Sequence, residues 1–129
     1  MPPAGFAVSL PFGDEAARAA RVMVGQLLAQ QGCPGQLVED GRLVAHELIV
    51  NGVTHGVPDA HAEIALSCRV LASHVVISVL DGGHGGDLGV RPATADSLHG
   101  RGLAIVEALS DRWTVDRTAG TRVEAWLPR

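Results

Sequence analysis

HELIVNGVTH, residues 46–55, is the segment that decides how this 129-residue chain folds and what it binds. It has the pattern of the C-terminal end of an apolar helix, and Asn51 is the only asparagine in the chain. Glu47 lies four residues before Asn51, so a helix places both side chains on one face, one turn apart. The Asn51 carboxamide suits a hard cation, and the Glu47 carboxylate suits orienting or deprotonating a nucleophile. On spacing alone, an ordinary solvated helix face fits this pair at least as well.

Hydrophobic periodicity on either side of this segment predicts three helices and five strands. The expected helices run from Asp14 to about residue 30, from 36 to 55, and from 100 to 110. The expected strands are 6–12, 62–71, 75–81, 112–118 and 121–127. We expect Asp14 to cap the first helix, and Pro11 restricts the first strand to a sheet edge.

The stretch 82–99 is rich in glycine and has no hydrophobic period. Loops this long in compact domains are usually functional lids or disordered linkers. We expect a lid, because the chain has the length and organisation of a single domain over residues 1–129. The order of elements predicts an α+β fold: a two-layer α/β sandwich with helices on one face of a mixed, largely antiparallel sheet.

Composition excludes several classes of function. The chain carries ten arginines and no lysine, so a Walker A phosphate loop, which needs its lysine, is excluded. The formal charge of −4 and the scattered basic residues give no footprint for nucleic acid. Cys33 and Cys68 show no metal or redox spacing and are expected to be reduced thiols. Without a signal peptide or an apolar run of about 18 residues, we expect a cytoplasmic protein.

Asp81 is out of pattern for its strand. It follows Val75, Ile77 and Val79 on the face expected to be apolar, where an unpaired carboxylate is costly. An exocyclic amine of adenine would be a suitable hydrogen-bond donor to it. Gly83 would leave room for a base to approach closely, and Thr121 would add a hydroxyl if its strand neighbours that of Asp81. Taken separately, each feature also fits an ordinary turn at a strand end.

The segment Gly100-Arg101-Gly102-Leu103 is a glycine-rich entry into the last helix. Backbone N–H groups at a helix start attract phosphate, and a guanidinium adds positive charge. A flexible helix start with a solvated arginine is the alternative. The order of all these features along the chain carries more information than any one of them.

Four segments, ELIVNGVTHG, VLDGG, HGRGLAIVEALSDRW and GTRVEAWLP, resemble in this order the motifs of the GHKL superfamily of ATPases and kinases. The resemblance extends from about residue 10 to residue 128 and is closest to the stand-alone anti-sigma-factor serine/threonine kinases of bacteria. It implies a histidine-kinase-like ATPase fold with ATP and Mg²⁺ as cofactors.

The resemblance also implies a role for each motif residue. Asn51 would ligate Mg²⁺, and Glu47 would act as the general base or orient the attacking hydroxyl. Asp81 would accept from the adenine amine, with Gly83 and Thr121 completing the base pocket. The phosphates would be held as the lid closes by Gly100, Arg101, Gly102 and Leu103. This chain departs from the family pattern at Gly52, where the family usually has alanine, and in the unusually glycine-rich start of the lid.

The function implied is an anti-sigma factor that binds a sigma factor as a homodimer and phosphorylates an anti-anti-sigma partner with Mg-ATP. One alternative is an ATP-binding regulatory module that transfers no phosphate. Another is a detached histidine-kinase catalytic domain, which is less expected because the sequence lacks the dimerisation helices and phosphoacceptor histidine of such kinases.

Overall fold

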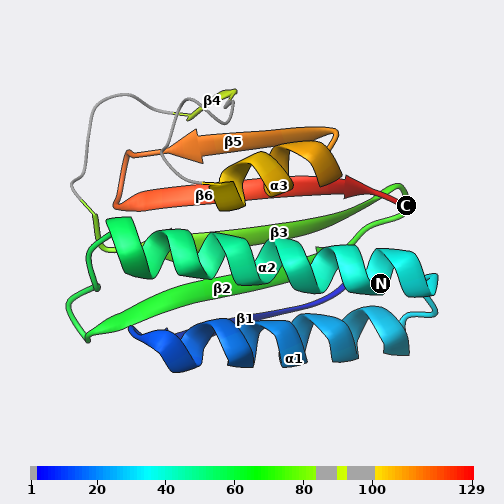
Figure 1. Ribbon diagram of the computed structural model, residues 1–129, viewed down its shortest axis with the longest axis horizontal. Helices are drawn as coiled ribbons and strands as arrows, with labels where there is room; N and C mark the ends of the chain where they lie inside the picture. The colour runs from blue at the N-terminus through cyan, green and yellow to red at the C-terminus, as the bar shows by residue number, and fades with distance from the viewer. Residues whose placement is uncertain (1–2, 84–89, 93–100) are drawn as a thin grey trace.

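The computed structural model describes residues 3–83, 90–92 and 101–129. Along the chain the elements are β1 (Ala4–Pro11), α1 (Asp14–Gln30), α2 (Gly35–His55), β2 (Glu63–Val70), β3 (His74–Asp81), β4 (Val90–Pro92), α3 (Arg101–Leu109), β5 (Arg112–Asp116) and β6 (Thr121–Pro128). Figure 1 shows α1, α2 and α3 on one face of a single sheet. The expected α+β two-layer sandwich is therefore confirmed.

Among the described residues, the sheet has six strands in the order β1-β2-β3-β6-β5-β4. Every described pairing is antiparallel, so the expectation of a mixed sheet is wrong in this respect. β1 lies at one edge, as Pro11 required, because proline has no N–H to give to a neighbouring strand. The central pair, β3 and β6, comes from distant parts of the chain and positions the candidate site.

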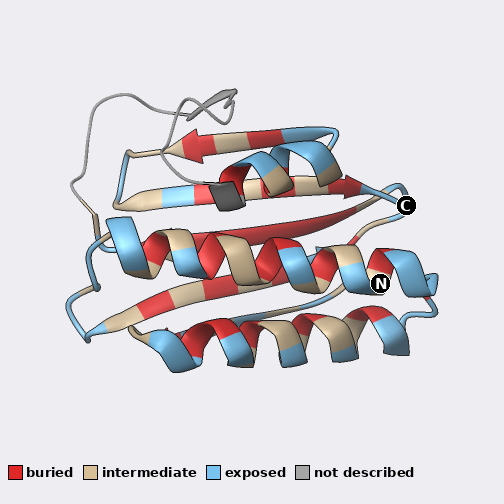
Figure 2. Cartoon of the chain, viewed as in Figure 1, coloured by how far each residue is buried: buried red, intermediate tan, exposed pale blue. Residues whose placement is uncertain are grey.

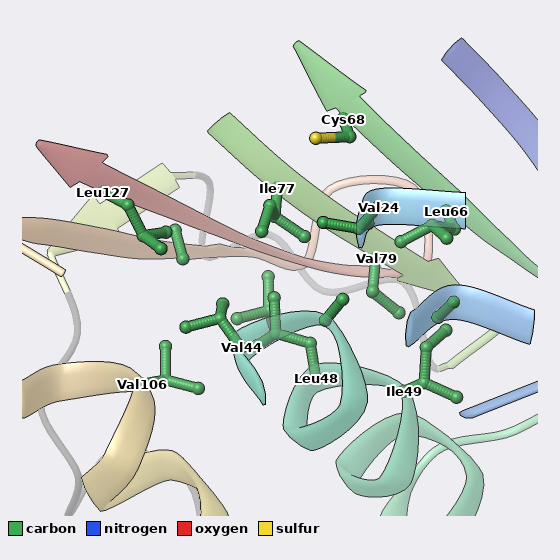
Figure 3. Close-up of a cluster of buried hydrophobic side chains, with 14 of the residues drawn as sticks. Val24, Val44, Leu48, Ile49, Leu66, Cys68, Ile77, Val79, Val106 and Leu127 are labelled. Atoms are coloured by element: carbon green, nitrogen blue, oxygen red, sulfur yellow. The ribbon is translucent and has the colours of Figure 1, made fainter. Parts of the chain in front are cut away.

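The core lies between the sheet and the helices. In Figure 3, Val44, Leu48 and Ile49 of α2 point toward Ile77 and Val79 of β3, and all five are buried. Complete burial of side chains of this size stabilises a fold by about 1.5–3 kcal/mol each. This packing fixes the rotation of α2 about its own axis.

The buried face of α2 follows the helical period. Leu37, Gly41, Val44, Leu48 and Gly52 are all buried, at spacings of three and four residues. Figure 2 shows this buried stripe alternating with intermediate and exposed positions along the helix. Glu47 and Asn51, each one residue before a buried position, lie half-buried beside the stripe.

Two local expectations are wrong. Gly13 rather than Asp14 occupies the N-cap of α1, and Asp14 is the first helical residue with no side-chain capping hydrogen bond. Its carboxylate still lies at the positive end of the helix dipole. The expected lid contains a strand, β4, which pairs Val90 with Asp116 and Pro92 with Thr114 at the sheet edge. A three-residue strand that ends in proline has too little periodicity to be seen in sequence.

Both cysteines are free and buried. Burial raises the pKa of the Cys68 thiol to about 12, so this thiol has little nucleophilic character in the folded protein. In the part of the chain that the structure describes, no helix combines the length and apolar character needed to cross a membrane.

Candidate functional site

Asp81 is the last residue of β3 and the centre of the candidate site. It continues the helix-facing row of β3 after Val75, Ile77 and Val79, and only 7% of its surface is exposed. In the antiparallel register of β3 and β6, Asp81 lies directly opposite Thr121. The strand neighbourhood on which the expected Thr121 contact depended is therefore present.

The Asp81 carboxylate is held by backbone groups. The Gly83 N–H donates to Oδ1 at 2.6 Å, and the Thr121 N–H also donates to the carboxylate. Burial raises the pKa of Asp81 above its usual value, and the two backbone hydrogen bonds oppose this shift only in part. The carboxylate is thus oriented by the fold but poorly solvated, so it is suited to accept a hydrogen bond from a ligand.

Glycines surround this carboxylate, and each is in contact with it or its strand. A Cβ added at Gly83 would lie 2.6 Å from Asp81 Oδ1 and 2.9 Å from Thr121 Oγ1. A Cβ at Gly56 would overlap Asp81 Oδ2, and one at Gly120 would overlap the Asp81 carbonyl oxygen. Gly120 also has a φ of +85°, which side-chain-bearing residues rarely adopt. The site is therefore a cradle with a carboxylate at its base and little side-chain bulk.

The motif analysis identified Asp81, Gly83 and Thr121 but missed the roles of Gly56 and Gly120. Gly56 ends α2, and Gly120 lies in the turn before β6. No local signal in the sequence distinguishes these two glycines from ordinary turn residues, because both make their contacts with the distant Asp81.

A flat heteroaromatic base fits this cradle. Its exocyclic amine would supply the donor that a buried carboxylate requires, and the glycines would let its edge approach the backbone. Adenine has such an amine. The described residues at this end of β3 and β6 could therefore hold such a base.

Glu47 and Asn51 both lie half-buried on α2. Gly52, the neighbour of Asn51, would place a Cβ 4.0 Å from Asp81 Oδ2, so the Asn51 backbone is close to the Asp81 carboxylate. Within the described ranges, no group of three or more His, Cys, Asp and Glu side chains is arranged to hold a metal. A cation held by Asn51 would therefore need further oxygen ligands from a bound phosphate chain or water.

The expected phosphate segment is only partly described. Arg101 and Gly102 begin α3, while Gly100 lies outside the described residues, as do 84–89 and 93–99 of the expected lid. Leu103 is 1% exposed and belongs to the hydrophobic core. Any contact between Leu103 and a nucleotide would therefore come from its backbone.

Gly52→Ala introduces the residue that the family usually has at this position. We expect it to change the stability of the protein little. The added Cβ would lie 2.7 Å from Ile64 Cδ1, which must move. That cost offsets the gain of up to about 1 kcal/mol from replacing a helical glycine. We expect a change in unfolding free energy within about 1 kcal/mol by chemical denaturation. A variant that fails to fold would contradict the expectation that the Ile64 Cδ1 methyl group can shift to make room.

A search of curated proteins found no match. A family model described as "histidine kinase-like ATPase domain" matches residues 10–126, a range that includes the described helices α1, α2 and α3, the Asp81 cradle, β3 and most of β6. The chain therefore belongs to the histidine kinase-like ATPase domain family, an ATP-binding module of the GHKL type.

Proposed function

We propose that this protein is an ATP-binding anti-sigma factor with serine/threonine kinase activity. The observation that carries the ATP site is the buried Asp81 carboxylate in its glycine cradle, opposite Thr121. Family membership supports a kinase-like module. The finer assignment rests on the resemblance of the four sequence segments to the stand-alone anti-sigma kinases.

The proposed work of the site is divided between the sheet and α2. Asp81, Gly83 and Thr121 bind the base, and Asn51 holds Mg²⁺. Bound Mg²⁺ would supply charge neutralisation on the phosphates, the main requirement of phosphoryl transfer. Glu47 receives or orients the proton of the attacking hydroxyl. Arg101 and its flanking glycines, Gly100 and Gly102, contact the phosphate chain.

The proposed physiological context follows the same resemblance. The protein acts in the cytoplasm as a homodimer, binds a sigma factor, and phosphorylates a serine or threonine of an anti-anti-sigma protein. Phosphorylation would add charge to that partner and so change its ability to compete for the anti-sigma factor.

A transfer assay tests the proposal. Purified protein is incubated with γ-labelled Mg-ATP and a candidate anti-anti-sigma protein, and the modified residue is identified by mass spectrometry. We expect label on a serine or threonine of the partner. ATP binding without transfer to any candidate would instead indicate a regulatory module, and label on a histidine would indicate a histidine-kinase catalytic domain. Either result would overturn the serine/threonine assignment.

A further inference from the structure

A groove runs between α1 and α2 on the outer surface of the helix layer, away from the sheet. Its volume is about 380 Å³, and its lining includes Arg21, Val22, Gly25, Val38 and Arg42. Val22 is 48% exposed, the highest value among the large hydrophobic residues that the structure describes as exposed. Figure 1 shows α1 and α2 lying side by side along their lengths.

Arg42 reaches across this groove from α2 to α1. A Cβ added at Gly25 would lie 2.9 Å from Arg42 Cδ and 3.2 Å from Cγ, so the arginine stem rests on the glycine backbone. Its one ion-pair partner in the described chain is Glu39, at 3.5 Å, and both side chains are largely in solvent, 43% and 67% exposed. An exposed pair of this kind leaves the guanidinium available to another carboxylate.

Arg21 brings a second positive charge to the groove from α1. Its Nη1 donates to His46 Nδ1 at 2.6 Å, since a guanidinium has no acceptor. Among the described residues, no carboxylate lies within ion-pairing distance of Arg21. Two guanidinium groups whose positive charge is little neutralised by carboxylates therefore border the apolar floor of the groove.

We propose that this groove docks an acidic, amphipathic segment of a protein partner. Carboxylates of the segment would pair with Arg21 and Arg42, and its apolar side chains would cover Val22 and Val38. A second copy of the chain is disfavoured, because groove against groove would bring arginines together. Nucleic acid is disfavoured by the apolar floor and by the net charge of −4. The inference goes beyond the proposed kinase function and does not depend on ATP.

Gly25 gives the proposal a distinctive variant. Gly25→Ala replaces a helical glycine by the best helix former, so α1 is expected to remain at least as stable. The new methyl group would occupy the position of the Arg42 stem and displace its guanidinium. We expect weaker docking of acidic segments without loss of thermal stability. If the substitution acted by misfolding the protein, both the affinity for acidic segments and the thermal stability would fall.

The test is selection from a phage-displayed library of random peptides, several helical turns long, on the purified full-length protein. We expect peptides enriched in Asp and Glu interleaved with Leu, Ile or Phe, which bind more weakly as salt concentration rises. Synthetic copies should lose about tenfold or more in affinity on Arg21→Ala or Arg42→Ala, measured by fluorescence anisotropy. Gly25→Ala should lose affinity as well.

Arg69→Ala is the matched control, since Arg69 is on the opposite face of the sheet and its ion pair with Glu124 is long, at 3.9 Å. It should leave peptide affinity unchanged. Selection of peptides without acidic enrichment, or affinities insensitive to Arg21 and Arg42, would overturn the proposal. A change of mass to a dimer that depends on Arg42 would assign the groove to a second copy and overturn it too. ATP affinity should stay unchanged throughout, so failure here is distinguishable from failure of the proposed kinase function.

Discussion

Asp81→Asn is expected to weaken ATP binding by about 10- to 100-fold while leaving the protein folded. A hydrogen bond to a charged group contributes about 1.5–3 kcal/mol, and each 1.4 kcal/mol is about tenfold in affinity. Asparagine keeps the size of aspartate, and its oxygen can still accept from the Gly83 N–H. Its amide nitrogen, however, presents a donor where the adenine amine also donates. Isothermal titration calorimetry with ATP measures the loss directly.

The same variant should be as stable as the wild type at neutral pH, or more stable. Burial raises the folded-state pKa of Asp81 above the ordinary value of 3.8. The protonated form is therefore favoured by folding, and its contribution to stability is fully present below the unfolded pKa. That contribution is lost as pH rises through the folded-state pKa. The melting temperature of Asp81→Asn relative to wild type should thus increase as pH rises from about 3.8 toward neutrality.

Asp116→Asn is the matched control for both measurements. Asp116 is half-buried at the end of β5, and hydrogen bonds from Thr118 lower its pKa, the opposite direction to that of Asp81. ATP affinity should be unchanged, and the stability difference should have the opposite sign with pH. If Asp81→Asn bound ATP as tightly as the wild type, the cradle would not be the base-binding site, and most of the functional assignment would be lost.

The fold was largely predictable because its signals are local and periodic. The alternation of Val75, Ile77 and Val79 and the helical stripe through Val44 and Leu48 each reflect burial against the same core. The sequence left open whether the strands of Asp81 and Thr121 are neighbours, and the structure pairs them. The parts that were missed depend on pairing between distant segments: β4 exists only because β5 offers it an edge, and its own residues carry too little pattern.

The same contrast between local and long-range signals applies to the candidate site. Asp81 stood out because an acid on an apolar face violates the strand pattern, and the structure buries it as that pattern required. The importance of Gly56 and Gly120 could not be read from local sequence. Each is needed because a distant backbone comes within contact of the Asp81 carboxylate or carbonyl oxygen, and such approaches exist only in three dimensions. Glycine is common in turns of all kinds, so its presence in the sequence does not distinguish a turn from a position that another part of the chain approaches closely.

Glu47→Ala and Asn51→Ala are expected to separate turnover from nucleotide binding. Loss of a positioned general base lowers the rate of transfer by about 10²- to 10⁴-fold. Glu47 is not among the groups assigned to the base or phosphates, so Glu47→Ala should bind ATP within about threefold of wild type, a difference of less than 1 kcal/mol. Both residues are half-buried on α2, and alanine favours helix, so neither substitution should unfold it.

Asn51→Ala should show the reverse dependence, because the carboxamide oxygen is proposed to hold Mg²⁺ against the phosphates. ATP affinity measured with Mg²⁺ and again with excess chelator should differ strongly in wild type and in Glu47→Ala, and little in Asn51→Ala. Glu39→Ala, an exposed acid on the same helix, should behave as wild type in both assays. If Glu47→Ala retained full transfer activity, the attacking hydroxyl would need another base. If Asn51→Ala kept its Mg²⁺ dependence, the cation would be held elsewhere in the site.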